Sequence, residues 1–295
     1  MTTTQKSIIQ AARAQFLASL LQADLSVDKD GVPSIADRGS AISKSIASSL
    51  IARLGKALTA EKNSGQSAGK GFEIAVADFL RTTFLALGHL RPGSWDVLHG
   101  SERSLVRISN FQQYNHLLRL AEKTKTDPDL RAVLGGEYFI EPDVVVVRHA
   151  EPDSVINQPG AIVDDQVSLL SPLRKSNVSS APGKFLHASI SCKWTIRSDR
   201  AQNARTEALN LIRNRNGHVP HIVAITAEPM PKRIASIAQG TSDLDCVYHI
   251  ALPELREAVS ESMEGRRSEQ DQDLEMLIAG KRLRDISDLP LDLAI

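Results

Sequence analysis

The stretch Phe185-Leu-His-Ala-Ser-Ile-Ser-Cys-Lys-Trp194 alternates apolar and polar side chains, which is typical of a β-strand. A helical period follows over 201–214, and the apolar run His221-Ile-Val-Ala-Ile-Thr226 is typical of a buried strand. Upstream, Tyr138-Phe-Ile-Glu-Pro-Asp-Val-Val-Val-Val-Arg148 is also rich in β-branched residues. This order of strand, strand, helix and strand predicts an α/β fold, with a central mixed β-sheet flanked by helices.

The N-terminal part of the chain has a different character, because its apolar residues recur at helical spacing. Within it, the segment 62–71 holds three glycines and two serines and is predicted to be flexible. The tail of the chain also has a helical period. The expected helices outside the sheet region cover 7–23, 42–58, 72–85 and 273–289.

These patterns predict one domain over 1–295, with an N-terminal helical region over 1–90 packed on a core over 137–226. Between two expected strands lies the segment 150–184, which has four prolines and no clear periodicity. A connection of this length is usually functional or mobile. Its apolar patch over 167–173 suits a contact between copies of the chain, and a mobile surface loop is the alternative.

Composition limits the classes of function. The 295 residues include 35 basic and 35 acidic ones, so the chain cannot bind nucleic acid through bulk charge and would need a local basic patch. Two cysteines, Cys192 and Cys246, cannot form a disulfide framework. We found no signal peptide and no apolar run of membrane-spanning length. We therefore expect a cytoplasmic protein with no membrane partner.

Three charged residues adjoin the expected strands and helix. Asp143 precedes the apolar part of the first strand, Lys193 ends the second, and Glu207 lies in the following helix. Two carboxylates can hold Mg²⁺, which lowers the pKa of a bound water, and a neighbouring lysine can offset charge in the transition state. The combination predicts metal-assisted phosphodiester hydrolysis, whereas each residue alone is explained as well by a solvated surface charge.

The segment from Lys193 to Arg215 supplies the local basic patch, with one lysine and five arginines against one aspartate and one glutamate. Within it, Arg197-Ser-Asp-Arg200 suits the reading of base edges, because arginine binds guanine bidentately and aspartate accepts from the cytosine amino group. The alternative is a solvated, salt-bridged helix start that is capped by Asp199.

The run Ser191-Cys-Lys-Trp-Thr-Ile-Arg-Ser-Asp-Arg-Ala-Gln-Asn203 resembles the active-site and recognition segment of type II restriction endonucleases of the NgoMIV kind. These enzymes belong to the PD-(D/E)xK nuclease superfamily, in the branch that cleaves sites with a central CCGG. The resemblance covers most of the chain and is most specific over 191–207. Most members of the superfamily have an acidic residue two positions before the lysine, and that position is Ser191 here. Enzymes of this branch supply the acid from the next helix instead, and Glu207 matches that acid.

The resemblance implies a restriction-endonuclease-like core and a set of catalytic residues. It implies Mg²⁺ as the cofactor. The implied catalytic residues are Asp143, Lys193, Glu207 and Glu73, the last in an N-terminal helix. The implied metal-site residues are Asp143, Glu207, Ser191 and Cys192, the last two through side chain or backbone. A glutamate beside the apolar Phe72 and Val76 is otherwise unusual, which favours a role for Glu73.

The same resemblance implies the contacts with double-stranded DNA. Arg197, Asp199 and Arg200 would read a CCGG core, Asp37 and Arg233 the outer base pair, and Gln66 the minor groove. Together these contacts imply cleavage at the palindrome GCCGGC. The implied assembly is a homodimer or homotetramer, with 150–184 as a place for the contact between dimers. No nucleotide cofactor is expected, because the glycine-rich run 65–71 departs from the P-loop spacing.

Two alternatives stay open at this point. One is a repair or recombination nuclease of the same fold that reads DNA structure, and the other is a non-catalytic DNA-binding regulator. The Asp199 side chain argues against the first, because an aspartate is unfavourable near phosphates and useful against base donors. The presence of Asp143, Lys193 and Glu207 argues against the second.

Overall fold

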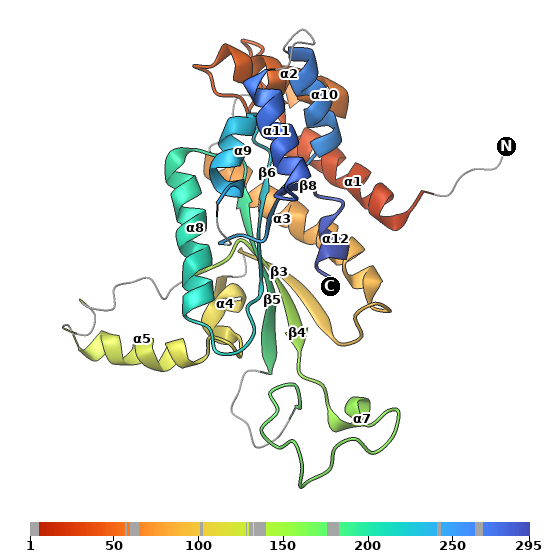
Figure 1. The fold of residues 1–295 in the computed structure, drawn as a ribbon, viewed down its shortest axis with the longest axis vertical. Helices are drawn as coiled ribbons and strands as arrows, with labels where there is room; N and C mark the ends of the chain where they lie inside the picture. Colours follow the sequence, from red (N-terminus) through yellow and green to blue (C-terminus); the bar gives the residue numbers. More distant parts are fainter. Residues whose placement is uncertain are drawn as a thin grey trace, which may run out of the picture.

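A six-stranded mixed sheet forms the centre of the protein, as seen in a computed structural model (Figure 1). The structure describes residues 6–56, 58–59, 65–100, 103–127, 129, 132, 140–175, 183–240, 243–262 and 268–295. In these residues the strands follow one another across the sheet in chain order. They are β3 (Trp95–His99), β4 (Val144–His149), β5 (Lys184–Lys193), β6 (His221–Thr226), β7 (Cys246–His249) and β8 (Leu283–Asp285).

The sheet changes direction at β5. Strands β3, β4 and β5 pair antiparallel, whereas β5 to β8 pair in parallel. Parallel neighbours need a crossover, which α8 (Ser198–Arg213) provides between β5 and β6. In register, Val144 at the start of β4 pairs with Ile190, and Lys193 at the end of β5 pairs with Thr226. The start of β4 and the ends of β5 and β6 therefore meet at one edge of the sheet.

Helices flank the sheet, which confirms the predicted fold class. Helix α3 (Gly65–Thr83) packs on β3, β4 and β5, and α1 (Ile8–Ala23) packs on α3. Helix α8 packs on α9 (Pro231–Ala238). Within the described ranges, no helix has the length and apolar composition needed to cross a membrane. The remaining helices are α2 (Ala41–Leu54), α4 (Arg103–Val106), α5 (His116–Thr126), α7 (Asp153–Ile156), α10 (Leu252–Ser262), α11 (Glu269–Ala279) and α12 (Leu289–Asp292). The smaller elements are β1 (Ser26–Val27), β2 (Leu58–Thr59), η1 (Leu85–Leu87) and η3 (Ile108–Asn110).

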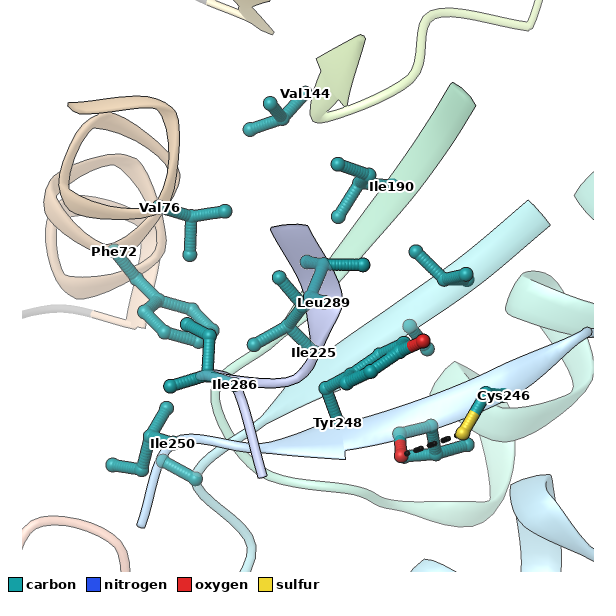
Figure 2. Packing of buried hydrophobic residues seen from close by; sticks show 14 of the residues in the cluster. Phe72, Val76, Val144, Ile190, Ile225, Cys246, Tyr248, Ile250, Ile286 and Leu289 are labelled. Carbon is teal, nitrogen blue, oxygen red and sulfur yellow. Dashed lines mark hydrogen bonds between the residues drawn. The ribbon is translucent and has the colours of Figure 1, made fainter. Parts of the chain in front are cut away.

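The core lies between α3 and the sheet. Figure 2 shows Phe72 and Val76 of α3 among the apolar side chains of the strands, such as Ile190 and Ile225, and all four are fully buried. Burial of each such side chain stabilises the fold by about 1.5–3 kcal/mol. The Phe72 ring also packs edge-on against Trp194, with centroids 5.2 Å apart. This packing fixes the N-terminal half of α3, including Glu73, beside the end of β5.

The prediction that 62–71 is flexible was wrong for 65–71, because α3 begins at Gly65. Residues 62–64 lie outside the described residues. Glycine in this helix has a packing reason at one position. A Cβ on Gly71 would lie 2.7 Å from Asp24 Oδ2, so any other residue at 71 would displace this buried carboxylate.

Other predicted boundaries also need correction. Helix α2 ends at Leu54 rather than at residue 58, because Gly55 turns the chain with a φ of 138°. Strand β4 begins only at Val144. The predicted helix over 273–289 ends at Ala279, and the left-handed Lys281 (φ 57°) leads the chain into the short strand β8.

Residues 150–175 extend from the far end of β4, around α7, at the bottom of Figure 1. Arg174 links two other parts of this segment. Its guanidinium donates two hydrogen bonds of 2.6 Å to the Asp153 carboxylate and one of 2.7 Å to the Val167 carbonyl. Leu170 in this loop is 97% exposed. Residues 176–182 lie outside the described part of the chain.

Candidate active site and adjoining cleft

The edge where β4 begins and β5 ends brings Asp143 and Lys193 together. Because Val144 pairs with Ile190, Asp143 lies opposite the end of β5. Its Oδ2 atom accepts a 2.7 Å hydrogen bond from the Cys192 backbone N–H and lies 3.5 Å from Lys193 Nζ. The backbone of β5 therefore holds the carboxylate in contact with the amine.

Glu207 reaches the same cluster from α8. Burial raises the pKa of its carboxyl group, the positive charge of Lys193 lowers it, and the negative charge of Asp143 raises it further. The net effect is a raised pKa. Such a carboxylate is destabilised by its surroundings and would be stabilised by a cation placed between it and Asp143.

Glu73 faces this cluster from α3. Its Oε2 atom lies 2.9 Å from the position that a Cβ on Gly100 would occupy, and the Gly100 N–H donates a 2.7 Å bond to the Asp143 carbonyl. Burial raises the pKa of the Cys192 thiol, and the negative charges of Asp143 and Glu73 raise it further. No pattern in the sequence pointed to Gly100, because the space that it leaves beside Glu73 depends on how α3 packs on the sheet.

The donor set suits a hard divalent cation. Asp143 and Glu207 offer carboxylate oxygens, the ligands that Mg²⁺ prefers. The hydroxyl oxygen of Ser191 is buried and makes no hydrogen bond within the described residues, so it has a free oxygen in the same region. Cys192 has a raised pKa, which disfavours the thiolate needed for metal binding, and it contributes through its backbone N–H. Among the described residues, no group of three or more His, Cys, Asp and Glu side chains forms a ready-made metal cluster.

A cleft of about 660 Å³ adjoins the end of β5. Three residues that the sequence predicted as DNA contacts, Asp37, Arg197 and Arg233, line it together. They come from the loop before α2, the connection from β5 to α8, and the first turn of α9. Arg233 Nη2 pairs with Asp37 Oδ2. The Gly39 N–H, Arg233 and Arg197 all lower the pKa of Asp37, which keeps it ionised.

The other three predicted contacts are placed only by their backbone. Asp199 and Arg200 lie in the first turn of α8, and Gln66 lies in the first turn of α3. Their side chains lie outside what the structure describes. The residue that precedes the first turn of α8 is Arg197, with extended backbone (φ −116°, ψ 163°), so Asp199 does not occupy the N-cap position of the alternative interpretation.

Glu228 is a further residue of this region that sequence reasoning missed. It follows β6, is 0% exposed, and accepts hydrogen bonds from the backbone N–H groups of Ile196 at 2.8 Å and Met230 at 3.1 Å. Burial raises the pKa of Glu228 to about 7 despite these bonds and the nearby Arg233. The only available signal was a carboxylate just beyond a buried strand that neighbours β5.

The sheet, its flanking helices and the cluster at the start of β4 define a class, the α/β nucleases with a restriction-endonuclease-like core. Comparison with known proteins narrows this class. Residues 18–295 match the family described as the NgoMIV restriction enzyme. The chain is also 46% identical over 272 residues to the type II restriction enzyme NgoMIV of Neisseria gonorrhoeae, a match that covers 92% of this chain and 93% of the relative.

The chain therefore belongs to the NgoMIV restriction enzyme family. This confirms the resemblance drawn from residues 191–207, and it makes the protein a type II restriction endonuclease, a hydrolase of phosphodiester bonds.

Proposed function

We propose that this restriction endonuclease cleaves both strands of DNA at the palindrome GCCGGC by Mg²⁺-dependent hydrolysis that leaves 5′-phosphate ends. One observation carries the proposal. Lys193 contacts Asp143, and the chain then runs from Lys193 directly into the cleft lined by Arg197. A chain segment that joins a phosphate-hydrolysing cluster to a base-reading surface links recognition to cleavage.

The residues of the cluster divide the chemistry among them. Asp143 and Glu207 would hold Mg²⁺, which neutralises phosphate charge and lowers the pKa of a bound water. The Cys192 N–H fixes the orientation of Asp143. Lys193 is placed to donate to an attacking water or to a phosphate oxygen and so to offset negative charge as it develops. Glu73 adds a third carboxylate on the α3 side of Asp143.

The cleft supplies the specificity. Arg197 and Arg200 would bind guanines bidentately, and Asp199 would accept from a cytosine amino group, which together read the CCGG core. The paired Asp37 and Arg233 present an acceptor beside a donor fork. This is the pattern that matches the cytosine amino group and the guanine O6 and N7 of one G·C pair. It supports G·C as the outer pair of the site, with Gln66 as a contact in the minor groove.

A palindromic site is read by two copies of the chain related by a two-fold axis. We propose that the enzyme acts as a homodimer that assembles further into a homotetramer. The exposed apolar side chains of the segment 150–184, which include Val167, Leu169 and Leu170, suit the contact between dimers.

Sequencing the ends of digested plasmid DNA tests this proposal. The enzyme with Mg²⁺ should give discrete fragments whose 5′-phosphate ends all fall within GCCGGC. Ends within another sequence would contradict the proposed specificity. Binding of GCCGGC duplex without cutting, with Mg²⁺ present, would contradict the proposed catalysis.

A further inference from the structure

Glu228 connects the two segments that carry the arginines of the cleft. Strands β5 and β6 are parallel and end side by side, with Lys193 paired to Thr226. One further backbone bond, from the Ala227 N–H to the Trp194 carbonyl, joins the two segments. Beyond it, one segment leads to Arg197 and α8, and the other leads to Arg233 and α9. Glu228 lies where they separate, and each of its carboxylate oxygens accepts a backbone N–H from one side.

The two hydrogen bonds tie the carboxylate to backbone groups that lie just before Arg197 and Arg233 in the sequence. Oε2 accepts from Ile196, the residue before Arg197, and Oε1 accepts from Met230, which precedes the first turn of α9. Arg233 Nη1 lies 4.0 Å from Glu228 Oε2, while Nη2 of the same guanidinium pairs with Asp37. The Arg233 head group is thus held between two carboxylates, one buried and one at the cleft.

Only an ionised carboxylate can make this full set of contacts. A glutamine at 228 would keep one acceptor oxygen, but its amide NH₂ would face a second N–H donor and would repel the Arg233 guanidinium. A buried donor left without an acceptor is costly, and the backbone would shift to avoid it. Such a shift would move Arg197 and Arg233 relative to each other.

We propose that Glu228 is a positioning residue for sequence recognition, which fixes the Arg197 segment and Arg233 in one relative arrangement at the cleft. The proposal rests on the proposed role of these two arginines as base readers. Glu228 lies beneath the cleft surface and acts through the arginines, without touching DNA itself.

The protonation state of Glu228 gives the proposal a measurable signature. Its pKa of about 7 means that the carboxylate is ionised at higher pH and neutral at lower pH. The charged groups that face it do not change over this range. Arg233 is an arginine, a residue type that is charged throughout this range. Asp37 has a lowered pKa and stays negative, and His249, which approaches from β7, has a pKa lowered to about 4 by burial and stays neutral.

The test compares cleavage of two duplexes by the wild-type enzyme and Glu228→Gln. One duplex carries the sequence at which the wild-type enzyme cuts, and the other differs from it by one base pair. The ratio of kcat/KM on the cut site to kcat/KM on the altered duplex should fall about tenfold in Glu228→Gln. On the cut site, the variant should show a raised KM, and its kcat should stay within about twofold of the wild-type value. The control is Glu254→Gln. Glu254 of α10 pairs with Arg13 of α1, and removing this carboxylate charge should leave the ratio unchanged.

The pH profile completes the test. The wild-type ratio should be higher at about pH 8 than at about pH 6, and that of Glu228→Gln should not vary, because the ratio cancels pH effects on the chemical step. A Glu228→Gln enzyme with wild-type discrimination at both pH values would overturn the proposal, as would an equal loss on both duplexes. If the variant does not fold, a wild-type ratio that is flat with pH overturns it. A cut site other than GCCGGC would contradict the proposed function and leave this test valid.

Discussion

Lys193 Nζ lies 3.5 Å from Asp143 Oδ2, at the point where β5 ends and β4 begins. The contact depends on strand register, since a shift of one residue would turn Lys193 to the other face of the sheet. The same register directs the chain beyond Lys193 into the cleft that holds Arg197. The position of this one pair therefore sets both the cluster proposed for catalysis and the surface proposed for recognition.

Replacing Lys193 with alanine should abolish cleavage and preserve specific binding. The amine offsets charge in the transition state, so its loss should lower kcat by about 10³-fold or more. Plasmid digestion with Mg²⁺ measures the first effect, and a gel-shift titration in Ca²⁺ measures the second. Lys123→Ala, on the exposed face of α5, is the control and should cut normally. Cleavage by Lys193→Ala at near wild-type rate would remove the lysine from the mechanism.

Glu207→Gln should stabilise the metal-free protein. The folded pKa of Glu207 is raised, so the native state binds this proton more firmly than the unfolded state does, and stability falls as pH rises through the unfolded and then the folded pKa. At pH 8 the neutral glutamine removes this cost, and the melting temperature should rise by about 2 °C. Addition of Mg²⁺ should stabilise the wild-type protein more than the variant. Equal Mg²⁺ effects on both proteins would argue against Glu207 as a ligand.

Gly100→Ala should impair catalysis by displacing Glu73. The new Cβ would lie 2.9 Å from Glu73 Oε2, so the carboxylate must move. We expect a loss of about tenfold in kcat, with little further loss when Glu73→Gln is combined with it, because both changes act on one interaction. Gly88→Ala, where the nearest atom is 3.7 Å away, is the matched control. Fully additive losses in the double variant would show that Gly100 acts independently of Glu73.

Arg233→Ala should relax the choice of the outer base pair and keep the requirement for the CCGG core. A bidentate contact with guanine contributes roughly 1–3 kcal/mol of discrimination, or about 5- to 150-fold. Cleavage rates on duplexes that vary only at the outer pair measure this effect. An equal loss of activity on all duplexes would instead indicate that Arg233 supports the fold or contacts phosphates.

The sequence predicted those parts of the fold and site that depend on local pattern. The strand over 221–226 matches β6, because a continuous apolar run is a strong signal for a strand buried on both faces. Lys193 and Asp143 were predictable because each lies at one end of an expected strand. The short strands β7 and β8, four and three residues long, were missed because so few residues cannot show a period.

Residues whose proposed roles depend on tertiary contacts could not be identified from local sequence pattern. The role predicted for Gly100 depends on Glu73 of α3, whose carboxylate lies 2.9 Å from the position of a Cβ on Gly100. The role proposed for Glu228 depends on the parallel pairing of β5 and β6, which brings the Ile196 N–H to its carboxylate. Asp37 and Arg233 could be proposed only from the resemblance, and their direct pairing became visible once α9 was placed beside the loop before α2.

The most direct test of the proposed catalysis is a crystal structure of the enzyme bound to its cut-site duplex and soaked with Mn²⁺, which gives an anomalous signal. A Mn²⁺ ion should bind within about 2.2 Å of oxygens from both Asp143 and Glu207, beside the scissile phosphate. An ion bound away from either carboxylate, or carboxylates that turn away from the phosphate and from Lys193, would contradict the proposed catalysis.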